Sequence, residues 1–132
     1  MKTAARTKQI KVLMVEDNTI YANFIQEALS SGEKAEFEVD VCSHLSEGVS
    51  AAQTDDYNVI LLDLGLPDSQ GADTASSFRS QVNEDTPVVI LTGEDDSSVA
   101  LEALSKGEAW DYLPKHVTDL DKLQHAVCDA AR

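Results

Sequence analysis

The chain has 132 residues, with 24 acidic and 10 basic side chains and a formal net charge of −14. Hydrophobic residues make up 42% of it, which suits one folded domain and is too high for a disordered acidic chain. The negative charge argues against unaided binding to nucleic acid or to an anionic membrane. No apolar run approaches the length of a membrane span or of a signal-peptide core, so we expect a cytoplasmic protein.

Strand patterns and helix patterns alternate along the chain after a polar N-terminal tail at residues 1–9. The hydrophobic spacing predicts, in chain order, strand 10–15, helix 20–29, strand 37–41, helix 45–52, strand 59–62, helix 75–82, strand 88–91, helix 99–104, strand 112–113 and helix 120–127. Asn18 is the expected N-cap of the first helix, whose apolar stripe begins at Ile20, and Gly32 is its expected stop. The stretch 65–71, with a proline between two glycines, is predicted to be a loop.

This alternation favours an α/β fold. Three of the strand segments are unbroken apolar runs, as in strands covered on both faces, whereas residues 37–41 alternate with acids as at a sheet edge. Such a pattern predicts a doubly wound parallel sheet with helices on both faces. We expect residues 10–132 to form this one domain. In such folds ligands bind beyond the carboxyl ends of the strands.

Charged and hydroxyl side chains follow the predicted strand ends. Glu16 and Asp17 follow the first strand, and Asp63 follows the third. Thr92 follows the fourth strand and Lys115 follows the fifth. Three converging carboxylates destabilise one another unless a cation joins them, and their hard oxygens suit Mg²⁺. With a lysine charge and a hydroxyl donor at the same rim, the set is suited to phosphate.

Four motifs in a fixed order carry a family resemblance. They are Val-Glu-Asp-Asn at 15–18, Leu-Leu-Asp-Leu-Gly-Leu-Pro-Asp-Ser-Gln-Gly at 61–71, Val-Ile-Leu-Thr-Gly at 89–93 and Asp-Tyr-Leu-Pro-Lys at 111–115. With them the chain resembles the receiver domain of two-component response regulators, the CheY-like family. The resemblance implies a flavodoxin-like (βα)5 fold with a five-stranded sheet in the order 2-1-3-4-5. It also implies that a histidine kinase or a histidine phosphotransfer protein phosphorylates one aspartate.

The resemblance assigns the phosphoacceptor and metal roles by position. It makes Asp63 the phosphoacceptor and a metal ligand, Asp17 a direct ligand of Mg²⁺, and Glu16 a ligand acting through water. The backbone carbonyl of Gly65 adds another oxygen. A carboxylate needs no general base to attack phosphorus, so positioning and charge neutralisation supply most of the catalysis.

Three residues take the phosphate-contact and switch roles in this resemblance. Lys115 binds the phosphoryl oxygens, Thr92 is the switch hydroxyl, and Tyr112 is the aromatic residue that turns inward when the hydroxyl engages phosphate. The surface of the last two helices and the last strand then changes, and a downstream effector protein or domain reads it. Such a protein catalyses its own phosphorylation and dephosphorylation but acts as a switch rather than as a turnover enzyme.

The sequence departs from the family pattern in places and leaves alternatives open. Pro114 precedes Lys115, whereas family members commonly carry a proline after this lysine, and Glu108 replaces a usual glycine with Gly107 one place earlier. An aspartyl phosphatase usually has a second aspartate where this chain has Gly65. A flavodoxin-like cofactor binder would offer hydroxyls and glycines rather than carboxylates in its first loop. The main alternative is a receiver-like interaction module that is never phosphorylated.

Overall fold

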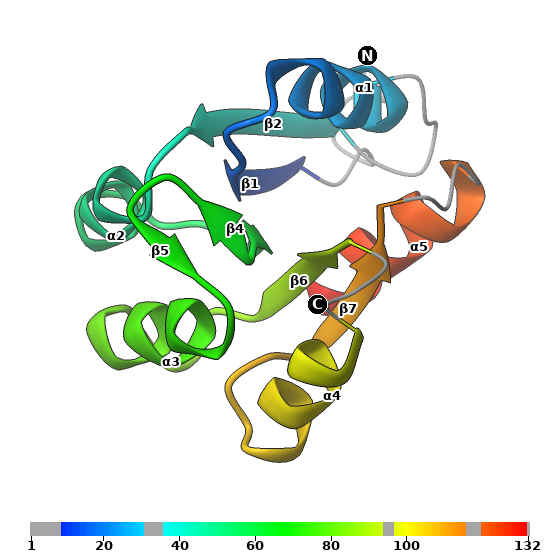
Figure 1. The fold of residues 1–132 in the computed structure, drawn as a ribbon. Coiled ribbons are helices and arrows are strands. Elements are labelled where there is room, and N and C mark those ends of the chain that lie inside the picture. Colours follow the sequence, from blue (N-terminus) through cyan, green and yellow to red (C-terminus); the bar gives the residue numbers. More distant parts are fainter. Residues whose placement is uncertain (1–8, 31–35, 94–96, 116–119, 132) are drawn as a thin grey trace, which may run out of the picture.

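The computed structural model describes residues 9–30, 36–93, 97–115 and 120–131. Its centre is a five-stranded parallel sheet with the order β2-β1-β3-β6-β7 (Figure 1). The strands are β1 (Gln9–Val15), β2 (Glu36–Cys42), β3 (Val59–Asp63), β6 (Val88–Thr92) and β7 (Asp111–Pro114). When these five strands alone are numbered, the order is 2-1-3-4-5, so the predicted fold class and topology are confirmed. β1 begins at Gln9, one residue before the predicted start.

Helices cover both faces of the sheet. They are α1 (Thr19–Ser30), α2 (Leu45–Thr54), α3 (Ala72–Gln81), α4 (Ser97–Ser105) and α5 (Leu120–Ala130). α1 and α5 pack on one face, against β1 side chains such as Val12 and Met14. α2 and α3 pack on the other face, against Leu13 and Val15, and α4 packs there against Ile90 of β6. Since alternate residues of a strand point to opposite faces, β1 contributes to both cores. Among the described residues, no helix combines the length and the apolar character needed to cross a membrane.

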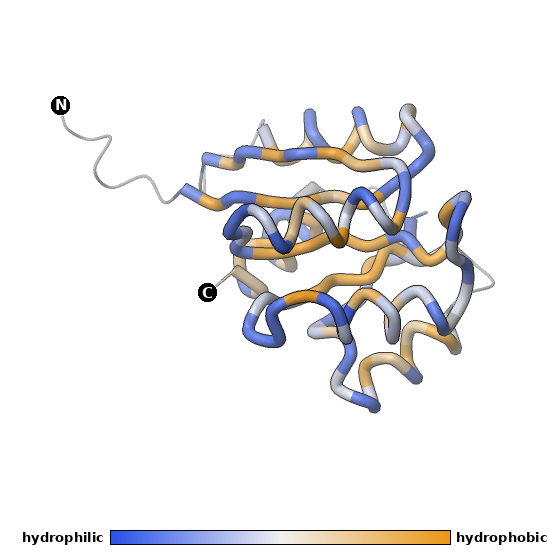
Figure 2. Tube along the Cα trace, turned by 90° about the vertical axis from the view of Figure 1, so that its left-hand side faces the viewer, coloured by the Kyte–Doolittle hydropathy of each residue, from blue (hydrophilic) through white to orange (hydrophobic). Residues whose placement is uncertain are grey.

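Burial across the sheet follows the hydrophobic pattern of each strand. β3 and β6 lie in the middle of the sheet and are buried over their whole length, as their unbroken apolar runs predict. β2 is an edge strand of exposed and half-buried residues, in line with its alternating acids. Figure 2 shows the apolar colour concentrated on the central strands, while the helices alternate between apolar and polar colours. The residues at the carboxyl ends of β3 and β6 are thus carried by strands that are packed on both faces.

The first turn of α1 differs from the prediction at one position. Asn18 caps the helix as predicted, since its side-chain oxygen accepts the N–H of Tyr21 at 3.1 Å. The prediction that Ile20 begins the apolar stripe is wrong, because Ile20 is 82% exposed and the half-buried Tyr21 packs inward instead. With about 3.6 residues per turn, Ile20 falls at the margin of the face that buries Ile25. The predicted stop at Gly32 lies outside the described residues.

The stretch predicted to be a loop at residues 65–71 contains a small antiparallel hairpin, which corrects that prediction. β4 (Gly65–Leu66) pairs with β5 (Ser69–Gln70) across a two-residue turn. Leu66 is buried in the core between α2 and α3, and this anchors the hairpin to the sheet. The segment that follows Asp63 therefore has a fixed shape.

The turn of this hairpin also caps α2. Asp68 accepts the backbone N–H groups of Leu45 and Ser46 at 2.8 and 3.1 Å. His44, at the N-cap position of α2, makes no side-chain capping bond. The N–H of Leu45 is the main cause that lowers the pKa of Asp68 from its ordinary value. A residue distant in sequence thus satisfies helix donors that would otherwise need water.

The shifted glycine at the end of α4 preserves a regular helix ending. Gly107 adopts a left-handed φ of 77° and donates its N–H to the carbonyl of Leu104 at 3.1 Å. Glu108 donates its N–H to the carbonyl of Ala103 at 2.9 Å, which completes the helix-ending turn that glycine favours. All peptide bonds of the described residues are trans, and His116 lies outside those residues.

Candidate functional site

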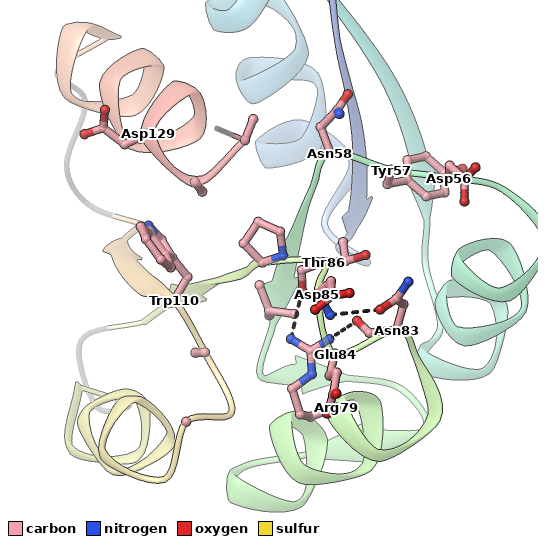
Figure 3. A pocket seen from close by; sticks show the side chains of 16 residues that line it. Asp56, Tyr57, Asn58, Arg79, Asn83, Glu84, Asp85, Thr86, Trp110 and Asp129 are labelled. Atoms are coloured by element: carbon pink, nitrogen blue, oxygen red, sulfur yellow. Dashed lines mark hydrogen bonds between the residues drawn. The ribbon is translucent and has the colours of Figure 1, made fainter.

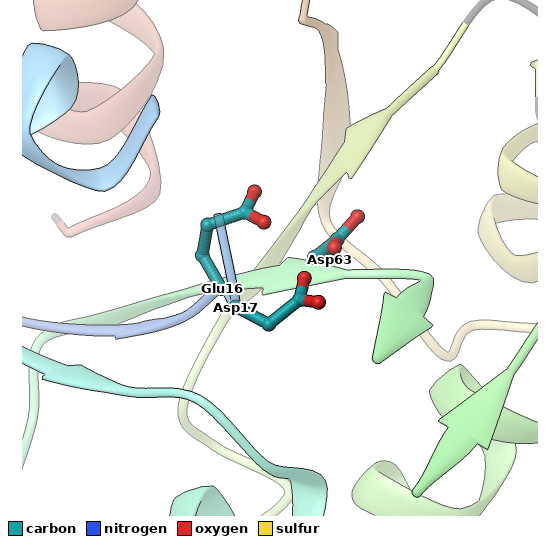
Figure 4. A group of neighbouring side chains, drawn as sticks. All are labelled: Glu16, Asp17 and Asp63. Atoms are coloured by element: carbon teal, nitrogen blue, oxygen red, sulfur yellow. The ribbon is translucent and has the colours of Figure 1, made fainter. Parts of the chain in front are cut away.

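Two neighbouring strands bring three carboxylates together at the carboxyl edge of the sheet. Glu16 and Asp17 directly follow β1, and Asp63 is the last residue of β3, which pairs with β1. The pairing of Val15 with Leu62 sets the two strand ends level. One oxygen from each carboxylate lies within 4.8 Å of the others, and Figure 4 shows the three side chains at this edge. The structure thus brings together the three acids that the sequence places at strand ends.

Glu16 is the most buried of the three acids. Its exposed fraction is 2%, against 5% for Asp63, whereas Asp17 is exposed. The backbone of Glu16 donates to the carbonyl of Cys42 at 2.8 Å, and its Oε2 accepts the N–H of Asn18 at 3.1 Å. Burial raises the pKa of Glu16 to about 7, and the charge of Asp63 adds to this rise, although the neighbouring lysine and the N–H of Asn18 oppose it. The negative charge of the site is therefore only partly compensated.

Lys115 reaches the same site from the end of β7. Its Nζ lies 2.6 Å from Glu16 Oε1 and 3.1 Å from Asp63 Oδ1. The backbone N–H of Lys115 donates to the carbonyl of Thr92 at 2.7 Å, which ties the lysine to the end of β6. Burial alone would lower the pKa of Lys115, but its bond to Glu16 and the charge of Asp63 raise it above the ordinary value. The ammonium therefore stays charged between two buried carboxylates.

The remaining predicted site residues, Thr92, Tyr112 and Gly65, differ in how deeply they are buried. Thr92 ends β6 and is fully buried, and its Oγ1 has no hydrogen-bond partner among the described residues. A buried hydroxyl without a partner is unusual, because it loses hydration without compensation. Tyr112, on β7, is half-buried and packs with Ile90 in the core on the α4 side. Gly65 is exposed and opens β4, two residues after Asp63.

The donor set fits a hard divalent cation. Ionised, the carboxylates of Glu16, Asp17 and Asp63 carry three negative charges, of which Lys115 balances one. All the converging protein donors are carboxylate oxygens, the ligands that Mg²⁺ takes in proteins. The exposed Asp17 gives the cluster a side open to water, as a cation that retains several waters requires.

One residue beside the lysine was missed by the sequence interpretation. The ring of Tyr21, on α1, lies with its centroid 5.0 Å from Lys115 Nζ. The contact joins two segments that are far apart in the chain, and no spacing rule or motif connects them. Only the position of Tyr21 in the first turn after the Glu16–Asp17 pair could have suggested it.

A hollow lies at the opposite, amino edge of the sheet. It has a volume of about 720 Å³ and includes the residues Asn58, Pro87 and Trp110, which precede β3, β6 and β7. Figure 3 shows Arg79 in this hollow, donating to the carbonyl of Asn83 and, at 2.9 Å, to that of Thr86. Arg79 thus braces the loop before β6, and the hollow shares none of the site residues described above.

Comparison of the sequence with known families and proteins gives consistent matches. The family model described as "Response regulator receiver domain" matches residues 12–128. The cell cycle transcriptional regulator CtrA of Caulobacter vibrioides is 34% identical over 121 residues, covering 89% of this chain and 50% of CtrA. Response regulator protein PmrA of Pseudomonas aeruginosa is 33% identical over 121 residues, covering 89% of this chain and 51% of PmrA. The chain spans about half the length of these relatives.

Solved structures give the same picture of the fold. The receiver domain of a Francisella response regulator, 1452, is similar with a TM-score of 0.77 and 29% identity, covering 92% of this chain and 96% of that one. A CheY-like response regulator receiver domain protein of Methanospirillum hungatei is similar with a TM-score of 0.78 and 20% identity. That match covers 95% of this chain and 94% of the other, and it shows a shared fold.

Proposed function

The chain belongs to the response regulator receiver domains of two-component signalling, and from this premise we propose that Asp63 is the aspartate that accepts the phosphoryl group. The observation that carries the proposal is the convergence of three carboxylates within 4.8 Å around an ammonium that lies 3.1 Å from Asp63. Of the three acids, Asp63 alone lies on the central strand β3. Lys115 contacts its carboxylate, and the β4–β5 hairpin begins two residues after it.

Asp63 acts as the nucleophile in this proposal. An ionised carboxylate has no proton to lose, so one of its oxygens can attack phosphorus without a general base. The new oxygen–phosphorus bond forms as the bond between phosphorus and the donor breaks, and the leaving group takes the electron pair. The product is an acyl phosphate on Asp63. Most of the acceleration comes from holding the reactants in line and neutralising charge.

We infer that Mg²⁺ is the cation of this site, since receiver domains generally bind it at an acidic cluster of this kind. When bound, the ion supplies positive charge that stabilises the transferring phosphoryl group. Asp17 and Asp63 would hold it directly and Glu16 through water, and the carbonyl of Gly65 would add a backbone oxygen. The bonds that already occupy both oxygens of Glu16, from Lys115 and from the N–H of Asn18, and the exposure of Asp17 support this division of roles.

Lys115 and Thr92 bind the phosphoryl group once it is on Asp63. Lys115 bridges Glu16 and Asp63 before transfer, and after transfer its Nζ binds phosphoryl oxygens in place of the Asp63 carboxylate. The hydroxyl of Thr92 donates to another phosphoryl oxygen, which gives this unpartnered group a hydrogen bond. Tyr112 then moves further inward. The change passes to the surface of α4, β7 and α5, which has two arrangements of different affinity for partners.

The partners follow from this chemistry. The donor is a phosphohistidine on a kinase or on a phosphotransfer protein, and the reader is a downstream effector protein or domain. CtrA and PmrA are named as regulators, and this chain matches about half of each. The signalling output of the present chain is thus a change of binding at its surface rather than release of a product.

Intact-mass spectrometry after incubation with acetyl phosphate tests this function. The wild-type chain gains the mass of one phosphoryl group when Mg²⁺ is present and gains none after chelation. Asp63→Asn gains none, whereas Asp68→Asn, a nearby exposed control, is modified like the wild type. An adduct that persists in Asp63→Asn contradicts the assignment of the phosphoacceptor. A wild type that is never modified supports the interaction module that works without phosphorylation.

A further inference from the structure

The aromatic ring of Tyr21 lies beside the ammonium of Lys115. Tyr21 lies in the first turn of α1, and its N–H is held by the side chain of Asn18 at 3.1 Å. Its ring centroid is 5.0 Å from Lys115 Nζ, within the distance at which an ammonium is attracted to the face of an aromatic ring. The capped helix end thus fixes the ring at a defined place beside the carboxylates.

Three neighbours lie close to the ammonium of Lys115. Glu16 Oε1 lies 2.6 Å from Nζ, Asp63 Oδ1 lies 3.1 Å from it, and the centroid of the Tyr21 ring lies 5.0 Å from it. The side chain of Lys115 is only 24% exposed, so little water competes with these contacts. Attraction between a cation and an aromatic ring strengthens when both are withdrawn from water.

The Tyr21 ring and the two carboxylates attract Lys115 in different ways. A carboxylate accepts N–H bonds, and the bond from Asp63 must be exchanged when Asp63 carries a phosphoryl group. The Tyr21 ring attracts the cation through its electron-rich face, so the N–H groups remain available for phosphoryl oxygens. Burial, with the nearby charges of Glu16 and Asp63, raises the pKa of Tyr21 to about 12, so the ring is neutral in every state of the site at neutral pH.

We propose that Tyr21 is a positioning residue, whose ring holds the Lys115 ammonium beside Asp63 through phosphoryl transfer and so sets the rate at which Asp63 is modified. This inference rests on the proposed function of Asp63 and goes beyond it, since Tyr21 lies outside every motif of the resemblance. The loss of an ion–aromatic contact of this kind corresponds to about a two- to thirtyfold change in rate.

The experiment compares four forms of the full chain: wild type, Tyr21→Phe, Tyr21→Leu and Phe24→Leu. Phe24 is the matched control, since it is a half-buried aromatic residue of the same helix whose ring lies 6.2 Å from that of Tyr21. The first readout is the rate of phosphorylation by acetyl phosphate with saturating Mg²⁺. The second is the NMR shift of the Lys115 ε-methylene protons, which are next to the Nζ that lies 5.0 Å from the ring centroid. The ring moves their signal upfield whether or not phosphorylation occurs.

Tyr21→Phe keeps the ring, so we expect it to retain most of the wild-type rate and the upfield shift. Tyr21→Leu, which keeps an apolar side chain but lacks the ring, loses the upfield shift and is about two- to thirtyfold slower, while Phe24→Leu stays near the wild-type rate. Tyr21→Met replaces Tyr21→Leu if the leucine variant does not fold. A wild-type rate in Tyr21→Leu overturns the inference alone, as does an equal loss in Tyr21→Phe. A wild type that is not phosphorylated at all overturns the proposed function, and the inference with it.

Discussion

Replacing Lys115 with methionine would measure how strongly the carboxylates of the site depend on one ammonium. The variant keeps most of the side-chain volume but leaves Glu16 and Asp63, which are 2% and 5% exposed, without a counter-charge. Removing one partner of a buried ion pair costs about 3–5 kcal/mol. The cost is limited here because Glu16, with a pKa of about 7, can take up a proton at pH 8 for only about 1 kcal/mol. We therefore expect the free energy of unfolding at pH 8, without Mg²⁺, to fall by about 2–3 kcal/mol.

The sign of the pH dependence follows from the raised pKa of Glu16. Because the folded protein holds this proton up to about pH 7 and the unfolded chain releases it near its ordinary pKa of 4.5, Glu16 makes the fold less stable as pH rises through that window. Without Lys115 the pKa rises further, so the difference between variant and wild type is larger at pH 8 than at pH 6. Urea unfolding at both values measures it.

Lys106→Met is the matched control for this prediction. Lys106 pairs with Glu102 at 2.9 Å on the exposed surface of α4, so the variant removes the same charge from a solvated ion pair. We expect no measurable change in stability without Mg²⁺. Mg²⁺ should stabilise Lys106→Met by the same amount as the wild type, because the three acids are intact in both, and should stabilise Lys115→Met by more. Equal stability of Lys115→Met and the wild type at pH 8 would refute the reasoning about buried, uncompensated carboxylates.

Three further substitutions test individual contacts of the fold and of the proposed switch. Asp68→Ala removes the cap of α2 and should lower the free energy of unfolding by about 1 kcal/mol in urea, so an unchanged midpoint would contradict the cap. Gly48→Ala places a Cβ 2.6 Å from Val15 Cγ2 and should lower the free energy of unfolding by about 1–2 kcal/mol, after the gain in helix propensity is subtracted. A more stable variant would show that the core adjusts to the added methyl group. Thr92→Val loses no hydrogen bond among the described residues, so we expect unchanged or higher stability. After acetyl phosphate treatment this variant should show no NMR shift of Tyr112, and a persisting shift would contradict the switch role of Thr92.

The parts of the fold that depend on hydrophobic pattern could be predicted from the sequence. The apolar runs of β3 and β6 are buried on both faces, and the alternating β2 lies at an edge. The gathering of Glu16, Asp17 and Asp63 could also be predicted, because parallel strands end at one edge of a sheet, and both the Glu16–Asp17 pair and Asp63 come directly after apolar runs. The capping role of Asn18 follows from local chemistry.

Features that depend on contacts between distant segments could not be predicted in this way. The cap of α2 by Asp68 and the contact of Tyr21 with Lys115 join side chains whose meeting depends on how the helices pack on the sheet. The exposure of Ile20 has a similar cause, because a helix periodicity defines an apolar arc but not which margin of the arc meets the core. The missing partner of Thr92 Oγ1 is visible only when all its neighbours are placed.

The binding of beryllofluoride, a mimic of the phosphoryl group, tests the central claim most directly. Fluorine NMR of the wild-type chain should show bound beryllofluoride only when Mg²⁺ is present, because the claim requires a cation and the Asp63 carboxylate at one place. Asp63→Asn should show none under the same conditions. Bound signals of equal intensity in Asp63→Asn, or binding by the wild type that is unchanged by removing Mg²⁺, would contradict the account.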